Sequence, residues 1–101
     1  MTLEKWDSSY GQLSEKNMRQ LLEKRGYTTA CYTYPPGTYF PDHTHRKEKI
    51  DGVISGKFRI KMGGNTYDLG PGDMIRVPAG SVHSAEVIGE EPVISVDAVK
   101  R

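Results

Sequence analysis

From Tyr27 to the C-terminus, Gly, Pro or Asn interrupts the chain every several residues, and the segments between these breaks alternate in polarity. Such alternation is typical of strands with one buried face. In the segment 58–62, Phe, Ile and Met share one face while Arg and Lys share the other, and Gly63-Gly64-Asn65 then supplies residues suited to a tight hairpin. Many short strands joined by such turns predict an all-β barrel or sandwich rather than an α/β fold.

One segment, from Ser14 to Arg25, carries helical signals. Ser14 is a candidate N-cap, Gly26 follows the last turn, and apolar residues recur at helical spacing, namely Met18, Leu21 and Leu22. We therefore predict one short helix outside the main sheet. The residues before it include Trp6, so this arm packs either on the barrel or on a second subunit. The predicted organisation is an arm and helix at 1–26 followed by a β-barrel at 27–101.

Length and charge limit the functions that this chain can perform. Its 101 residues suit one domain with one core, and a net charge of +1 provides no general attraction to nucleic acid or to acidic membranes. No apolar run approaches a membrane span, and the first residues lack a secretory pattern, so we expect a cytoplasmic protein. A single cysteine, Cys31, excludes a multi-cysteine zinc site. A bound metal would therefore need nitrogen and oxygen ligands.

The three histidines of the chain are His43, His45 and His83. Residues two apart in a strand project from the same face, so His43 and His45 can direct both imidazoles to one point. A third imidazole from a neighbouring strand would complete a set of neutral ligands for Fe(II), Ni(II), Zn(II), Cu(II) or Mn(II). Such a set leaves coordination positions open for water or substrate.

The spacing around these histidines resembles the two motifs of the cupin superfamily. Gly37, the His43-Thr44-His45 triplet and Gly56 resemble the first motif, and the run from Gly72 to His83 is similar to the second. This resemblance to small single-domain cupins implies a double-stranded β-helix barrel with an internal metal bound by His43, His45 and His83. It also implies a homodimer, for which Trp6 is the candidate anchor.

The chain departs from the motif where many cupins carry a glutamate ligand. Lys49 occupies that position, and Glu48 lies one residue out of register, which places it on the opposite face unless a bulge intervenes. We therefore keep Glu48 as a candidate fourth ligand. Lys49 is a candidate catalytic residue that anchors a substrate carboxylate inside the cavity; in the alternative arrangement it reaches the barrel mouth and pairs with Glu48 or Asp51.

Three functional hypotheses follow. The resemblance favours a metal-dependent oxidoreductase, similar to the three-histidine dioxygenases, that acts with Fe(II) and O₂ on a small anionic substrate. A second hypothesis is a sugar or keto-acid isomerase or lyase that uses Zn(II) or Mn(II). A third is a non-enzymatic module that binds a metal or a small ligand.

Overall fold

The alternating segment at 58–62 lies in strand β5 (Lys57–Met62), which forms a hairpin with β6 (Asn65–Leu69). Gly63 and Gly64 connect the two strands with φ angles of 59° and 78°, a conformation that glycine adopts without steric cost. Phe58 lies opposite Leu69 in this hairpin, and Ile60 lies opposite Tyr67. The predicted hairpin is therefore confirmed, and the structure adds its register.

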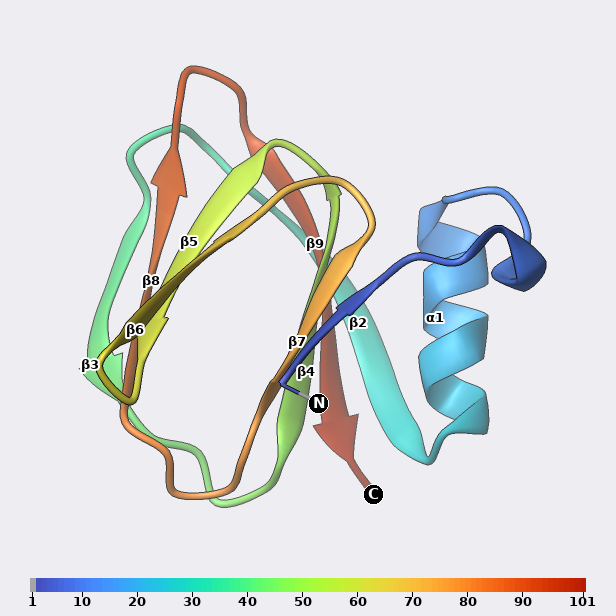
Figure 1. Ribbon diagram of the computed structural model, residues 1–101, viewed down its shortest axis with the longest axis horizontal. Helices are drawn as coiled ribbons and strands as arrows, with labels where there is room; N and C mark the ends of the chain where they lie inside the picture. The colour runs from blue at the N-terminus through green and yellow to red at the C-terminus, as the bar shows by residue number, and fades with distance from the viewer. Residues whose placement is uncertain (1) are drawn as a thin grey trace.

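The computed structural model describes residues 2–101, and within them nine strands form two antiparallel sheets that face each other (Figure 1). One sheet has five strands in the order β1-β7-β4-β9-β2, and the other has four in the order β3-β8-β5-β6. The bounds of the remaining strands are Leu3–Lys5 (β1), Tyr27–Tyr34 (β2), Tyr39–His43 (β3), Lys49–Ser55 (β4), Asp73–Val77 (β7), His83–Ile88 (β8) and Val93–Lys100 (β9). This arrangement is the predicted all-β, double-stranded β-helix barrel.

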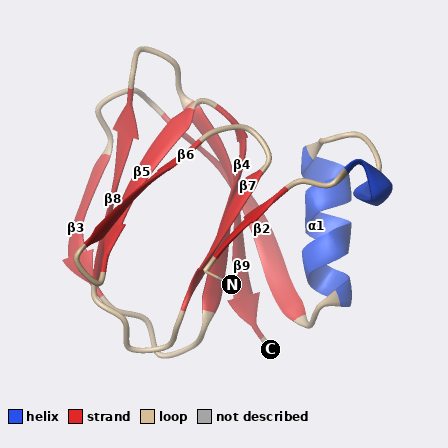
Figure 2. Cartoon of the chain, viewed as in Figure 1, coloured by secondary structure: helices blue, strands red, loops and turns tan. Residues whose placement is uncertain are grey.

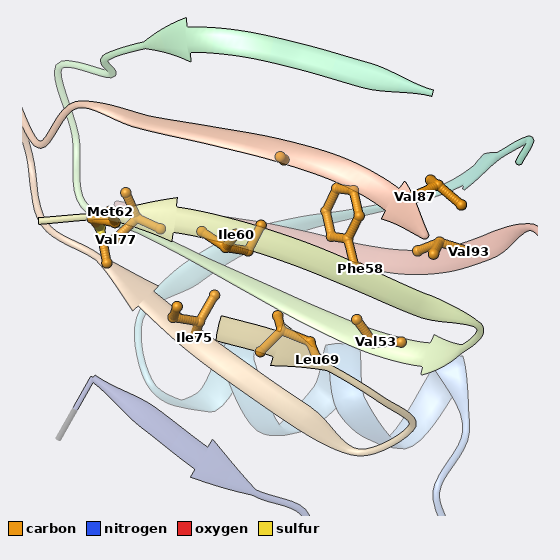
Figure 3. Close-up of a cluster of buried hydrophobic side chains, with 10 residues drawn as sticks. Val53, Phe58, Ile60, Met62, Leu69, Ile75, Val77, Val87 and Val93 are labelled. Carbon is orange, nitrogen blue, oxygen red and sulfur yellow. The ribbon is translucent and has the colours of Figure 1, made fainter. Parts of the chain in front are cut away.

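Apolar side chains from both sheets meet in the space between them (Figure 3). Phe58, Ile60 and Met62 project from β5, and Val53 and Ile75 project from the opposing sheet. All five are at least nine-tenths buried, so this cluster provides hydrophobic stabilisation that holds the sheets together. Figure 2 shows the turns and loops that connect the strands at both ends of the sandwich.

Helix α1 (Glu15–Lys24) covers the outer face of the five-stranded sheet, against β2 and β9 (Figure 1). Ser14 caps it by accepting a hydrogen bond from the amide of Asn17, as predicted for an N-cap. Met18 and Leu22 are completely buried. There is no room for a side chain at Gly52 on β4, because a Cβ atom there would overlap the Met18 sulfur. The helix and sheet thus approach each other at a position that lacks a side chain.

The N-terminal arm packs on the barrel of its own chain. Strand β1 pairs with β7, with Leu3 opposite Ile75, and the Trp6 amide donates a 2.8 Å hydrogen bond to the Gly72 carbonyl. The Trp6 indole packs beside the helix and donates to the carbonyl of Gly11. Of the two arrangements that the sequence left open, the structure has the arm on its own barrel.

Within residues 2–101, no helix is both long enough and apolar enough to cross a membrane.

Candidate metal centre

Two neighbouring strands of the four-stranded sheet position the histidines. His43 ends β3 and His83 begins β8, and the two residues are direct partners in the antiparallel register. His45 lies just beyond the end of β3, where its carbonyl accepts a 2.8 Å hydrogen bond from the Gly80 amide. This bond ties the β3–β4 connection to the turn before His83. The imidazoles therefore come together through strand pairing and one loop contact.

The three rings form a close group. Their ligand atoms all lie within 4.8 Å of one another, and the ring centroids of His43 and His83 are 4.2 Å apart. Nδ1 of His43 lies 2.6 Å from the Pro41 carbonyl, and Nδ1 of His83 lies 2.9 Å from the Ser81 carbonyl. Because a carbonyl only accepts, each Nδ1 carries the proton and each Nε2 keeps its lone pair. Those two Nε2 atoms are available as metal ligands.

Electrostatics also favours neutral imidazoles. Burial is the main cause that lowers the pKa of both His45 and His83, and the nearby ammonium of Lys49 lowers both further. At pH 7 these two rings are neutral, which is the form that ligates a metal. The donor set, three imidazoles without a thiolate, fits a divalent ion such as Mn(II), Fe(II), Ni(II) or Zn(II).

The histidines line a cavity of about 150 Å³ between the two sheets. Aromatic and small residues form its apolar part, namely Tyr34, Phe40, Phe58 and Ala85. Charged residues of the five-stranded sheet form the remaining wall, namely Lys49, Asp51 and Asp97. The cavity thus places one apolar surface and one charged surface next to the histidines.

Lys49 faces this cavity. Its Nζ atom lies 2.6 Å from Oδ1 of Asp97, and the two side chains are only 14% and 21% exposed. The sequence analysis considered Glu48 and Asp51 as partners for this lysine, and the structure instead pairs it with Asp97. The inward orientation is the one that an anion anchor requires.

Glu48 does not join the histidines, although it was a candidate fourth ligand. One carboxylate oxygen accepts a hydrogen bond from the Tyr27 hydroxyl, and the other lies 3.0 Å from Nη1 of Arg76. The Tyr27 bond is the main cause that lowers the pKa of Glu48. Residues two apart along a strand point to the same face, and Ile50 packs against the residues of α1. Glu48 therefore lies on the helix-covered face of the sheet, away from the cavity. The one-residue offset in the sequence is the physical reason.

Sequence reasoning missed Asp97 altogether. It lies on β9, in register with Asp51 on β4, and both side chains line the cavity. Strand β9 is covered on both faces, by the barrel interior and by α1, so its sequence lacks the simple alternation that would identify the inward residues. The one signal in the sequence that could have identified Asp97 is its charge within an otherwise mostly apolar strand.

The Cupin domain family model matches residues 30–99 of the chain, a span that includes the three histidines and the charged wall. The chain belongs to the cupin family.

Other proteins similar to this cupin include both uncharacterised proteins and enzymes. An uncharacterised Streptomyces coelicolor protein, SCO3923, is 29% identical over 72 residues, which are 71% of this chain and 69% of that protein. The structure of the DMSP lyase DddQ from Ruegeria pomeroyi is 26% identical, with a TM-score of 0.67 over 75% of this chain. Bacillus subtilis oxalate decarboxylase, which has Mn(II) centres, is 30% identical with a TM-score of 0.66 over 74% of this chain.

The two enzymes are much longer than this cupin. The matched region spans 39% of the DddQ chain and 22% of the oxalate decarboxylase chain. The similarity therefore extends to one barrel of each protein, and it supports the fold and the presence of a small-molecule cavity.

Proposed function

We propose that this cupin is a metal-dependent enzyme that binds one divalent ion on His43, His45 and His83 and acts on a small carboxylate. The observation that carries the proposal is the convergence of these imidazoles and the Lys49 ammonium on one cavity. Neutral imidazoles leave the double charge of a divalent ion unreduced, so that the ion attracts an anion. The charge of the Lys49 ammonium is balanced by Asp97, and its remaining N–H groups can donate to a substrate carboxylate.

The size of the cavity limits the substrate. A protein cavity of about 150 Å³ accommodates a molecule the size of benzene. A short-chain oxo acid or dicarboxylate has a similar number of non-hydrogen atoms and carries the negative charge that the site favours. Phe40, Phe58 and Tyr34 would contact the carbon skeleton of such a substrate, while Lys49 orients a carboxylate. A bound divalent ion supplies Lewis-acid polarisation of a substrate oxygen.

The similar enzymes support non-oxidative chemistry. DddQ is named as a lyase and the Bacillus enzyme as an oxalate decarboxylase, and oxalate is itself a small carboxylate. We therefore favour a lyase or isomerase reaction on a small oxo or dicarboxylic acid.

An Fe(II)- and O₂-dependent dioxygenase is the second candidate. Three neutral imidazoles with no carboxylate in the group favour it, because this is the ligand set of the dioxygenases that the sequence resembles. The two candidates differ in one measurable quantity, the consumption of O₂ during turnover.

The first experiment tests the site. Protein loaded with Co(II) should show one equivalent of bound metal and a visible spectrum that changes when oxalate or pyruvate is added. The His83→Ala variant should lose the bound metal. The Lys49→Met variant should keep the metal and bind the carboxylates more weakly, whereas Lys61→Met, which changes an exposed lysine on β5, should behave as wild type. Failure to bind metal, or a spectrum insensitive to carboxylates, would refute the proposal.

The second experiment tests turnover. Protein loaded separately with Fe(II), Mn(II), Zn(II) or Ni(II) is incubated with a panel of small oxo and dicarboxylic acids, while proton NMR follows products and an electrode follows O₂. Product formation without O₂ uptake supports the lyase or isomerase, and uptake coupled to product supports the dioxygenase. Binding without product from any member of the panel would instead indicate a non-enzymatic binding module.

A further inference from the structure

Two aspartates face each other in the charged wall of the cavity. Asp51 on β4 and Asp97 on β9 are direct partners in the antiparallel register, so their side chains leave adjacent strands on the same face. Lys49, two residues before Asp51, projects from that face too, with its Nζ atom 2.6 Å from Asp97 Oδ1. The wall therefore holds two carboxyl groups and one ammonium.

One of the two carboxyl groups in this wall must carry a proton. The ammonium of Lys49 compensates one carboxylate, and a second carboxylate at the same place would be desolvated and repelled by the first. The Asp51 and Asp97 carboxyls leave directly opposite positions of β4 and β9 and line the same cavity, so one of them is more stable protonated beside the other's anion. Because Asp97 lies against Lys49, its anion is the better stabilised, and the proton belongs to Asp51.

The stability of the barrel does not require this second carboxyl. A lysine and one aspartate would form a neutral buried pair, whereas an additional carboxyl adds desolvation and repulsion without a further cationic partner. Titratable groups whose ionisation is disfavoured in this way occur at catalytic sites. A catalytic role would account for the presence of Asp51 in the cavity that the histidines line.

Asp51 is suited to exchanging a proton near neutral pH. Burial is the main cause that raises the pKa of Asp51 to about 7; Asp97 raises it further, while Lys49 opposes the shift. It lines the same cavity as the three histidines and Tyr34. Burial raises the pKa of Tyr34 to about 12, so that hydroxyl stays protonated. A group with a pKa near the operating pH is the most effective general acid or base.

We propose that Asp51 is the catalytic acid–base group of this cupin and that it transfers a proton to and from the carbon beside the carbonyl of a small 2-oxo acid. Asp97 and Lys49 are positioning residues that set the charge around it. The inference rests on the proposed function, because the 2-oxo acid is held at the three histidines and Lys49.

The step balances without an oxidant or reductant. Ionised Asp51 takes the proton from the carbon, so that the C–H bond breaks and an O–H bond forms on Asp51. The electron pair of the C–H bond forms a C=C bond, and the carbonyl π pair moves onto the oxygen to give an enolate. Return of the proton to the same carbon restores the substrate, and its delivery to the enolate oxygen gives the enol tautomer.

Exchange of carbon-bound hydrogen provides a direct test. Pyruvate has a methyl group beside its carbonyl and about six non-hydrogen atoms, the size of a benzene-sized ligand. Zn(II)-loaded protein in D₂O should accelerate deuterium incorporation into the pyruvate methyl group, followed by proton NMR. Asp51→Asn should lower the protein-dependent rate by about 100-fold or more, the usual contribution of general acid–base catalysis. Asp51→Glu should restore part of it.

Two further variants separate catalysis from structure. Asp97→Asn removes the like charge beside Asp51, so the pH profile of exchange should move to lower pH. Asp68→Asn alters an aspartate on the hairpin strand β6 that is 46% exposed and paired with Arg59, and it should leave both rate and profile unchanged. A purely structural role for Asp97 would lower the rate without moving the profile, and that result would refute its role as a positioning residue.

The failures of the two proposals are distinguishable. If pyruvate changes the spectrum of the Co(II) protein but the wild type causes no exchange, or if Asp51→Asn exchanges at the wild-type rate, Asp51 is not the acid–base group and the proposed metal site stands. If pyruvate does not change that spectrum, or if His83→Ala supports exchange as well as wild type, the proposed function fails and this inference fails with it.

Discussion

Replacing Lys49 with methionine tests how the charged wall of the cavity is stabilised. Methionine keeps most of the length and apolar character of the stem but removes the ammonium that lies 2.6 Å from Asp97. The Asp97 carboxylate would then lie beside Asp51 without its cation. We expect the variant to fold and to be less stable than wild type in the absence of metal.

The magnitude follows from the burial of the pair. Breaking a fully buried ion pair by removing one partner costs about 3–5 kcal/mol, whereas exposed pairs contribute roughly 0–1 kcal/mol. The side chains of Lys49 and Asp97 are 14% and 21% exposed, so we expect a loss of about 2 kcal/mol. For a domain of this size that loss lowers Tm by roughly 8–16 °C. The loss should be smaller at pH 5 than at pH 8, because the pKa of Asp51 is raised to about 7, so the variant holds one unpaired carboxylate at pH 5 and two at pH 8.

Urea unfolding in EDTA, at pH 5 and pH 8, measures these differences directly. Lys61→Met provides the matched control, since that lysine is exposed on β5, and it should change the free energy of unfolding by less than about 0.5 kcal/mol. A double-mutant cycle with Asp97→Asn should show that the double variant loses less than the sum of the single variants. Equal losses for Lys49→Met and Lys61→Met, or additive effects in the cycle, would refute the buried ion pair as a source of stability.

Further predictions concern the metal, pH and assembly. His83→Ala should reduce bound metal, measured by elemental analysis, from one equivalent to none, and retention of metal would contradict the site. Burial lowers the pKa of His45 below its ordinary value, so metal affinity measured by titration should fall as pH drops below about 6.5, and a pH-independent affinity would contradict imidazole ligation. The pKa of Asp51 is raised to about 7 from an ordinary 3.8, so its contribution to the stability of metal-free protein is complete below about pH 4 and is lost as pH rises through 7. Asp51→Asn should remove this loss in urea unfolding between pH 4 and 8. The homodimer implied by the cupin resemblance predicts twice the 11.3 kDa chain mass in light scattering, and a monomer mass would contradict it.

Local sequence signals were sufficient for the hairpin and the helix. The polarity of residues 58–62 and the two glycines after them specified the buried face of β5 and the turn to β6. Ser14 and the buried pair Met18 and Leu22 specified where α1 begins and which side faces the sheet. Both signals depend on neighbouring residues, so they can be read before the fold is known.

The histidine cluster was predictable for a different reason. The chain has only three histidines, and their spacing resembles a family pattern in which distant positions are known to meet. Strand pairing then places His43 directly beside His83. The sequence could not show that β3 ends at His43, which puts His45 in the connection to β4 rather than in the strand.

What the sequence by itself determined is the fold class, the turns, the helix and the three imidazoles, because alternation, caps and spacing are local or carried by motifs. Only the tertiary structure decided the charge of the cavity. Lys49 meets Asp97 across a strand pair separated by 48 positions in the chain, and Glu48 lies on the other face with Arg76. The sequence gives no signal for the direction of a carboxylate on β9, since both faces of this strand are covered and both carry apolar residues. The pairing of β4 with β9 is therefore what brings Asp97 to the cavity of the histidines.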